Sequence, residues 1–127
     1  VKLINSWLLW VAELFLSPLL LPTASLTCVP STCQSSKTGS GTTSITLSLI
    51  DSCPNGCDIE WYYSGNSIFN NNSGENPKTF SYYCRNLSES KTGTVGAIVT
   101  DKLTGMNKNV SKTLIISCNA SGGGMDP

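Results

Sequence analysis

The sequence predicts an all-β sandwich of about seven short antiparallel strands. Stretches of alternating apolar and polar residues recur along the chain, and turn-forming residues separate them at intervals of roughly 8–15 residues. After an apolar N-terminal segment no stretch shows the helical period, so the sheets are expected to pack on each other. A chain of 127 residues has room for one such domain.

Residues 1–25 are expected to form a signal peptide or a membrane anchor. The stretch from Trp7 to Leu21 is mostly apolar, but it is interrupted and is shorter than the about 20 residues that span a bilayer. It fits the hydrophobic region of a secretory signal, and Thr23 and Ser25 provide small residues for cleavage after Ser25. A retained anchor or a filament-forming helix is the alternative.

The domain itself is expected to occupy residues 26–118. Between residues 43 and 50, for example, Ile45, Leu47 and Leu49 alternate with serine and threonine, which is the pattern of a half-buried strand. Residues 30–41 are expected to form a polar loop, and the glycine-rich residues 119–127 a flexible tail or linker. The predicted strands cover residues 26–29, 43–50, 57–65, 67–69, 78–85, 94–100 and 110–118.

The strand that contains Trp61 is expected to be central in the sandwich. Ile59, Trp61 and Tyr63 alternate with two acidic residues and Tyr62, which gives the strand one apolar and one polar face. A tryptophan can bury about 150–250 Å². Trp61 is therefore the predicted core anchor.

The six cysteines are expected to form disulfides in an exported protein. Their gaps do not match the C-x2-C pairs of zinc sites, and the chain has no histidine. Six cysteines allow about 15 pairings, so the connectivity stays open; Cys53 and Cys57 flank a turn and either bridge each other or tie this corner to another strand. The candidates are Cys28, Cys33, Cys53, Cys57, Cys84 and Cys118.

Composition argues against several classes of function. Lysine plus arginine and aspartate plus glutamate both number 8, which leaves no basic patch for nucleic acid. Without histidine, Ser-His and Cys-His nucleophiles are impossible. Asp58 and Glu60 share one face of a strand and could hold a cation or act as an acid–base pair, but a solvated face is the favoured interpretation. We expect no enzyme activity, no metal and no cofactor.

Four N-x-S/T motifs are candidate N-glycosylation sites. They lie in predicted loops or at strand ends, where an exported protein would carry glycans. Their asparagines are Asn71, Asn86, Asn109 and Asn119.

The segment IEWYYSG around Trp61 resembles the third strand of immunoglobulin-like domains. Cys53, Trp61 and Tyr82-Tyr83-Cys84 suggest the immunoglobulin pattern, but only 23 residues separate Trp61 from Cys84, fewer than that family usually has. The segments GTVGAIVTDKLTG and VSKTLIISC are more similar to PKD-like modules of secreted and surface proteins, although Val95 and Gly96 stand where an aromatic is commoner. The resemblance covers residues 42–118 and implies an immunoglobulin-like sandwich more than any one function.

The expected function is a non-catalytic domain, secreted or on the cell surface, for adhesion, recognition or surface assembly, with a protein or carbohydrate ligand. Membrane contact is expected only through the N-terminal segment. Tyr62 and Tyr83 are expected either to pack on neighbouring strands or to form a contact surface. The alternatives are a structural subunit of a filament or surface layer, and a carbohydrate-binding accessory domain of a secreted enzyme.

Overall fold

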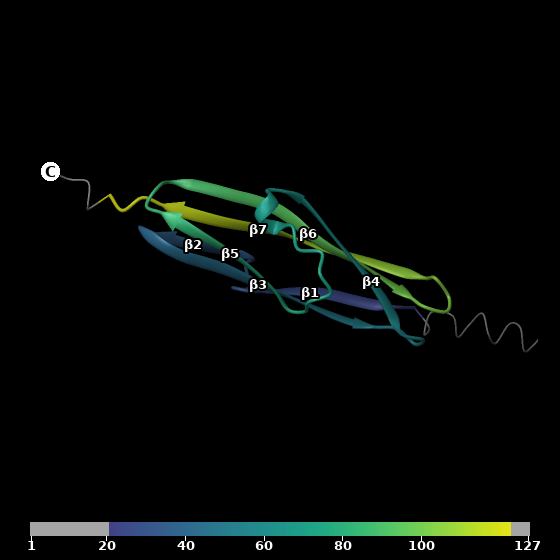
Figure 1. Ribbon diagram of the computed structural model, residues 1–127. Coiled ribbons are helices and arrows are strands. Elements are labelled where there is room, and N and C mark those ends of the chain that lie inside the picture. The colour runs from purple at the N-terminus through teal and green to yellow at the C-terminus, as the bar shows by residue number, and fades with distance from the viewer. Residues whose placement is uncertain (1–20, 123–127) are drawn as a thin grey trace, which may run out of the picture.

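The chain folds as two packed β-sheets, shown by a computed structural model that describes residues 21–122 (Figure 1). The predicted all-β, immunoglobulin-like sandwich is confirmed, and within the described residues it has seven strands. They are β1 (Thr23–Val29), β2 (Gln34–Thr38), β3 (Ser40–Ser52), β4 (Cys57–Gly65), β5 (Lys78–Arg85), β6 (Glu89–Asp101) and β7 (Asn107–Asn119), with the short 3-10 helix η2 (Ser67–Phe69) after β4.

One sheet has the strand order β1-β3-β5, and the other has the order β2-β7-β6-β4. The strands pair antiparallel, except that β2 runs parallel to β7. The chain crosses from the first sheet to the second between β1 and β2, so these consecutive strands lie at the edges of different sheets. The prediction of a wholly antiparallel sandwich is therefore wrong at this one pair.

Two predictions about individual segments are wrong: one strand was missed, and one segment predicted as a strand is a helix. β2 lies inside the predicted loop 30–41, and the predicted strand 67–69 is the helix η2. β2 is an edge strand with mostly exposed side chains, so it needs no alternating apolar pattern. In η2 the Asn66 side chain caps the first turn by accepting a hydrogen bond from the Ile68 N–H at 3.1 Å, and the Phe69 side chain is buried.

The core lies between the sheets. It is built from the residues of each strand that face inward, which alternate along the strand with residues that face outward. Phe69 and Phe80 pack with their ring centroids 5.7 Å apart. A Cβ at Gly93 would lie 2.5 Å from the Phe69 ring, so only glycine leaves room for this contact. The largest contributors from the strands are Ile45, Leu47, Leu49, Trp61, Phe80, Val95, Val99, Leu114 and Ile116.

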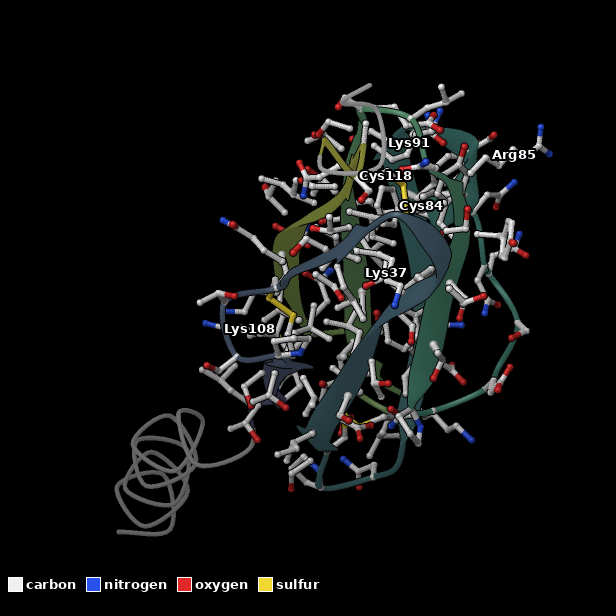
Figure 2. The ribbon with its side chains drawn as sticks, turned by 90° about the vertical axis from the view of Figure 1, so that its left-hand side faces the viewer. Lys37, Cys84, Arg85, Lys91, Lys108 and Cys118 are labelled. Atoms are coloured by element: carbon white, nitrogen blue, oxygen red, sulfur yellow. A yellow bond between two sulfur atoms is a disulfide. The ribbon has the colours of Figure 1, made fainter. Side chains whose placement is uncertain are left out.

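All six cysteines form disulfides, as the sequence predicts. Cys84–Cys118 joins β5 to β7 across the two sheets, and its two residues are 34 positions apart in the chain. Figure 2 shows this bond between the two layers, with Arg85 pointing away from it into solvent. The other two are local: Cys28–Cys33 closes the crossing from β1 to β2, and Cys53–Cys57 closes the turn between β3 and β4.

β1 begins at Thr23, which pairs with Ser52 of β3. Cleavage after Ser25 would therefore remove the first three residues of this strand. The rest of the expected signal peptide or anchor, residues 1–20, lies outside the described residues, as do residues 123–127 of the expected tail. Between residues 21 and 122, no helix is long and apolar enough to cross a membrane.

Asp101 ties together two turns at one end of the sandwich. Its buried carboxylate accepts hydrogen bonds from the Leu103 and Thr104 N–H groups of its own turn, at 3.1 and 2.9 Å. It also accepts bonds from the backbone N–H and the side-chain amide of Asn55 in the β3–β4 turn, at 3.0 and 3.1 Å. The Thr104 N–H, followed by the bonds from Asn55, holds the pKa of Asp101 well below its usual range, although burial opposes this shift.

Candidate functional site

The edge strand β4 carries two exposed apolar side chains, Ile59 and Tyr63, on its inner face. β4 pairs with β6 along its whole length, in a register that sets Trp61 opposite Ala97, and it has no strand on its other side. Across residues 21–122, no hydrogen bond outside the β6 ladder reaches the backbone of Asp58 to Ser64. The prediction that this strand is central is therefore wrong, because β4 closes the sheet instead of lying inside it.

Trp61 points from β4 into the core and is only 9% exposed. On the open side of the sandwich its ring is covered by Lys78 at the start of β5, with the Lys78 Nζ 4.5 Å from the ring centroid. This position allows a cation–π interaction. Lys78 thus bridges the gap between the β4 edge of one sheet and the β5 edge of the other.

Lys78 is fully buried, and sequence reasoning missed its role. Its Nζ donates hydrogen bonds to the Ser73 carbonyl at 2.6 Å and to the Asn71 Oδ1 at 3.5 Å, which fastens the loop between η2 and β5. Burial lowers the pKa of Lys78, and the charge of Glu75 opposes the shift. A lysine at the start of a strand gives no sequence signal of burial.

Ile59 and Tyr63 lie on the same face of β4 as Trp61 but remain 41% and 37% exposed. They flank Trp61 at the open edge, where no neighbouring strand covers them. The apolar stripe that the sequence predicts is therefore only partly buried. The exposed parts of Ile59 and Tyr63 therefore form an apolar margin beside the backbone of β4 that has no partner strand. We call Ile59, Trp61, Tyr63 and this free backbone the β4 edge.

The outer face of β4 is polar and solvated. Asp58 and Glu60 are both exposed, and the Asp58 carboxylate lies 4.0 Å from the Lys102 ammonium group. Among the described residues, no group of acidic, cysteine or histidine side chains could hold a metal ion.

Tyr62 and Tyr83, which were expected either to pack on neighbouring strands or to form a contact surface, differ in their packing. Tyr62 lies across Gly96 of β6, where a Cβ would overlap its ring, and its hydroxyl donates a hydrogen bond to the Asn109 Oδ1 at 2.6 Å. Tyr62 is therefore packed on neighbouring strands. Tyr83 is 56% exposed on the outer face of β5.

The other sheet edges carry residues that discourage pairing with another chain. Lysines, prolines and short strands are the usual protection of exposed edges. β2 is five residues long and contains Lys37. β1 contains none of these residues itself but lies between Pro22 and Pro30. Residues 107–113 of β7, which lack a partner on the β2 side, expose Lys108 and Lys112. β5 follows Pro77 and ends at Arg85. β4 contains no lysine, arginine or proline, and its charged residues are Asp58 and Glu60 on the outer face.

The sequon asparagines are spread over the molecule. Asn71 lies in the loop after η2, Asn86 in the β5–β6 turn, Asn109 near the start of β7 and Asn119 at its end. In the first three, the side-chain oxygen accepts a hydrogen bond, from Ser73, from the Ser121 N–H and from Tyr62 respectively. The nitrogen, which is the atom that N-glycosylation modifies, is not the bonded atom in any of them.

A shallow polar depression of about 250 Å³ lies at the opposite edge of the same sheet from β4. It offers small hydroxyl groups and one amide, without a charged group. It is lined by Thr32, Gln34, Ser35, Ser36 and Ser117.

Neither the protein-family models, nor the curated proteins, nor the solved structures contain a match to this chain. By its structure the chain is an all-β sandwich of immunoglobulin-like type. The comparisons do not support its assignment to the PKD-like or any other family.

Proposed function

We propose that this chain is a non-catalytic extracellular domain that recognises a protein partner, for adhesion or surface assembly, through the β4 edge. The observation that carries the proposal is the nine-residue strand β4, whose backbone is unpaired on one side and flanked by exposed apolar side chains. Such an edge accepts an extended segment as an additional strand, with main-chain hydrogen bonds giving affinity and alternate side chains giving specificity.

Three disulfides with no free cysteine in the described residues support the extracellular part of the proposal. Such a framework persists in oxidising compartments and is rare in the cytosol. The full chain produced in an exporting host should reach the medium or the cell surface. Alkylation followed by mass spectrometry should find no free thiol in the exported protein, and two or more alkylated cysteines would contradict this part.

N-glycosylation belongs to the same proposal. Asn119 is exposed at the end of β7, and the nitrogens of the other three sequon asparagines make no hydrogen bond with the described residues. Peptide mapping of the protein from a glycosylating host should find glycan on at least one of the four. If all four asparagines are unmodified, the glycosylation part of the proposal is wrong, and the proposal that β4 binds a partner is unaffected.

Recognition through the β4 edge can be tested with a library of linear peptides displayed on phage and selected against the immobilised protein. Selected peptides should alternate apolar and polar residues, as strands do, and should lose binding to Ile59→Lys. The matched control is Ile50→Lys, because Ile50 is also exposed, at 63%, but lies on β3 in the other sheet. Binding that both variants keep equally, or no enrichment of peptides, would overturn the proposal.

A further inference from the structure

We infer that the partner strand is β4 of a second copy of this chain. The two β4 strands would pair antiparallel about a two-fold axis at Trp61 and join two four-stranded sheets into one continuous sheet. The inference rests on the proposed function, since it uses the same edge, and it adds the identity of the partner. A two-fold contact of this kind is self-complementary and closes at the dimer.

The register about Trp61 follows from the length and symmetry of β4. Trp61 is the midpoint of Cys57–Gly65, so only an axis at this residue pairs all nine positions. In this register Ile59 lies opposite Tyr63 of the second copy. A shift of the pairing by one position would set inner-face residues opposite outer-face residues, which an antiparallel ladder does not allow.

Repulsion between carboxylates disfavours the registers whose two-fold axis lies nearer the N-terminal end of β4, at Glu60 or Ile59. With the axis at Trp61, Glu60 faces Tyr62 and Asp58 faces Ser64 of the second copy, so no like charges stand opposite each other. With the axis at Glu60, the two Glu60 carboxylates would meet. With the axis at Ile59, Asp58 would face Glu60. Like charges directly opposite each other destabilise a pair of strands.

The pairing would cover the apolar margin that β4 exposes. Ile59 and Tyr63 form two symmetric aliphatic–aromatic pairs across the new ladder, a combination that stabilises adjacent strands. The free N–H and C=O groups of β4 would gain partners. The contact involves one strand and is small, so we expect reversible association that depends on concentration.

Sedimentation velocity on the full chain, from low micromolar to near-millimolar concentration, tests the dimer. The wild-type protein should show a monomer–dimer equilibrium, and Ile59→Lys and Tyr63→Lys should each weaken it about tenfold or more by placing charge at the edge. The control Ile50→Lys should associate like the wild type. Two variants are used because one of them could lower stability, and each is first checked by circular dichroism.

Cysteine pairing tests the register. Asp58→Cys and Ser64→Cys, mixed under oxidising conditions, should form a disulfide-linked heterodimer, whereas either variant alone should not cross-link. A protein that stays monomeric while edge-dependent peptide binding persists would overturn the second copy as partner and leave the proposed function standing. Cross-linking of Asp58→Cys with itself, or dimerisation unaffected by both lysine variants, would overturn the geometry.

Discussion

At the scale of the residue, the core depends on one large side chain and the charged group that covers it. Trp61 reaches the core from an edge strand, so its ring would be open on one side without Lys78. The Lys78 ammonium group keeps hydrogen-bond partners in the adjacent loop, which offsets part of the free-energy cost of burying it. The burial of Trp61 and the position of this loop therefore depend on each other.

Replacing Trp61 with alanine should lower the free energy of unfolding by about 3–5 kcal/mol, because it removes a large buried side chain and leaves a cavity. Urea unfolding followed by circular dichroism measures the change. The control Tyr83→Ala removes an exposed ring and should change stability by no more than about 0.5 kcal/mol. Equal urea midpoints for Trp61→Ala and the wild type would show that the core does not depend on this residue.

Asp101 should make stability depend on pH in the acid range. Its pKa is lower in the folded state than in the unfolded chain, so its contribution is fully present above the unfolded value, near about 3.9, and is lost as the pH falls below that value. Asp101→Asn should therefore lower the Tm at pH 7, and the difference from the wild type should narrow toward pH 2. A difference in Tm that stays constant over this range would contradict the assignment.

At the scale of the element, the three disulfides have different roles. Cys84–Cys118 joins two strands of different sheets across a long stretch of chain, whereas the other two close short local connections. A cross-link restricts the unfolded chain more when the loop that it closes is longer. The link between sheets should therefore contribute most to stability.

Removing Cys84–Cys118 by a double alanine substitution should cost about 4 kcal/mol in the free energy of unfolding, against about 2 kcal/mol for Cys53–Cys57. Chemical denaturation of both double variants under identical conditions gives the comparison. The Cys53–Cys57 variant serves as the matched control, because it also removes two cysteines. A larger loss for the short loop would contradict the loop-length argument.

At the scale of the whole molecule, both sheets share one core. Residues from β1, β3 and β5 contact residues from β4, β6 and β7 in a single buried cluster, with Phe69 of η2 among them. A domain of this size with one core usually unfolds in a single cooperative step. We therefore expect the calorimetric and van't Hoff enthalpies of thermal unfolding to agree, and a ratio well above one would indicate that the sheets unfold separately.

Local sequence predicted those parts of the fold that have a local cause. The alternation through Ile45 and Leu49 predicted β3, because a strand with one buried face needs that period. Residues 78–85 were predicted as a strand and coincide with β5. Six cysteines in a short chain with an expected export signal predicted disulfides, the lack of zinc-type spacing argued against a metal site, and all six cysteines form disulfides.

What the sequence by itself determined is the class of the fold: a β-sandwich held by disulfides, with Trp61 on an alternating strand. Its prediction of short strands is wrong for β3, β6 and β7, which have 13 residues each. The tertiary structure alone decided which strands lie at the edges, because position in a sheet depends on pairing between distant segments. It placed the polar strand β2 beside β7, buried Lys78 over Trp61 and joined Cys84 to Cys118. It also left β4 paired with β6 on one side only, and the proposed site depends on that free side.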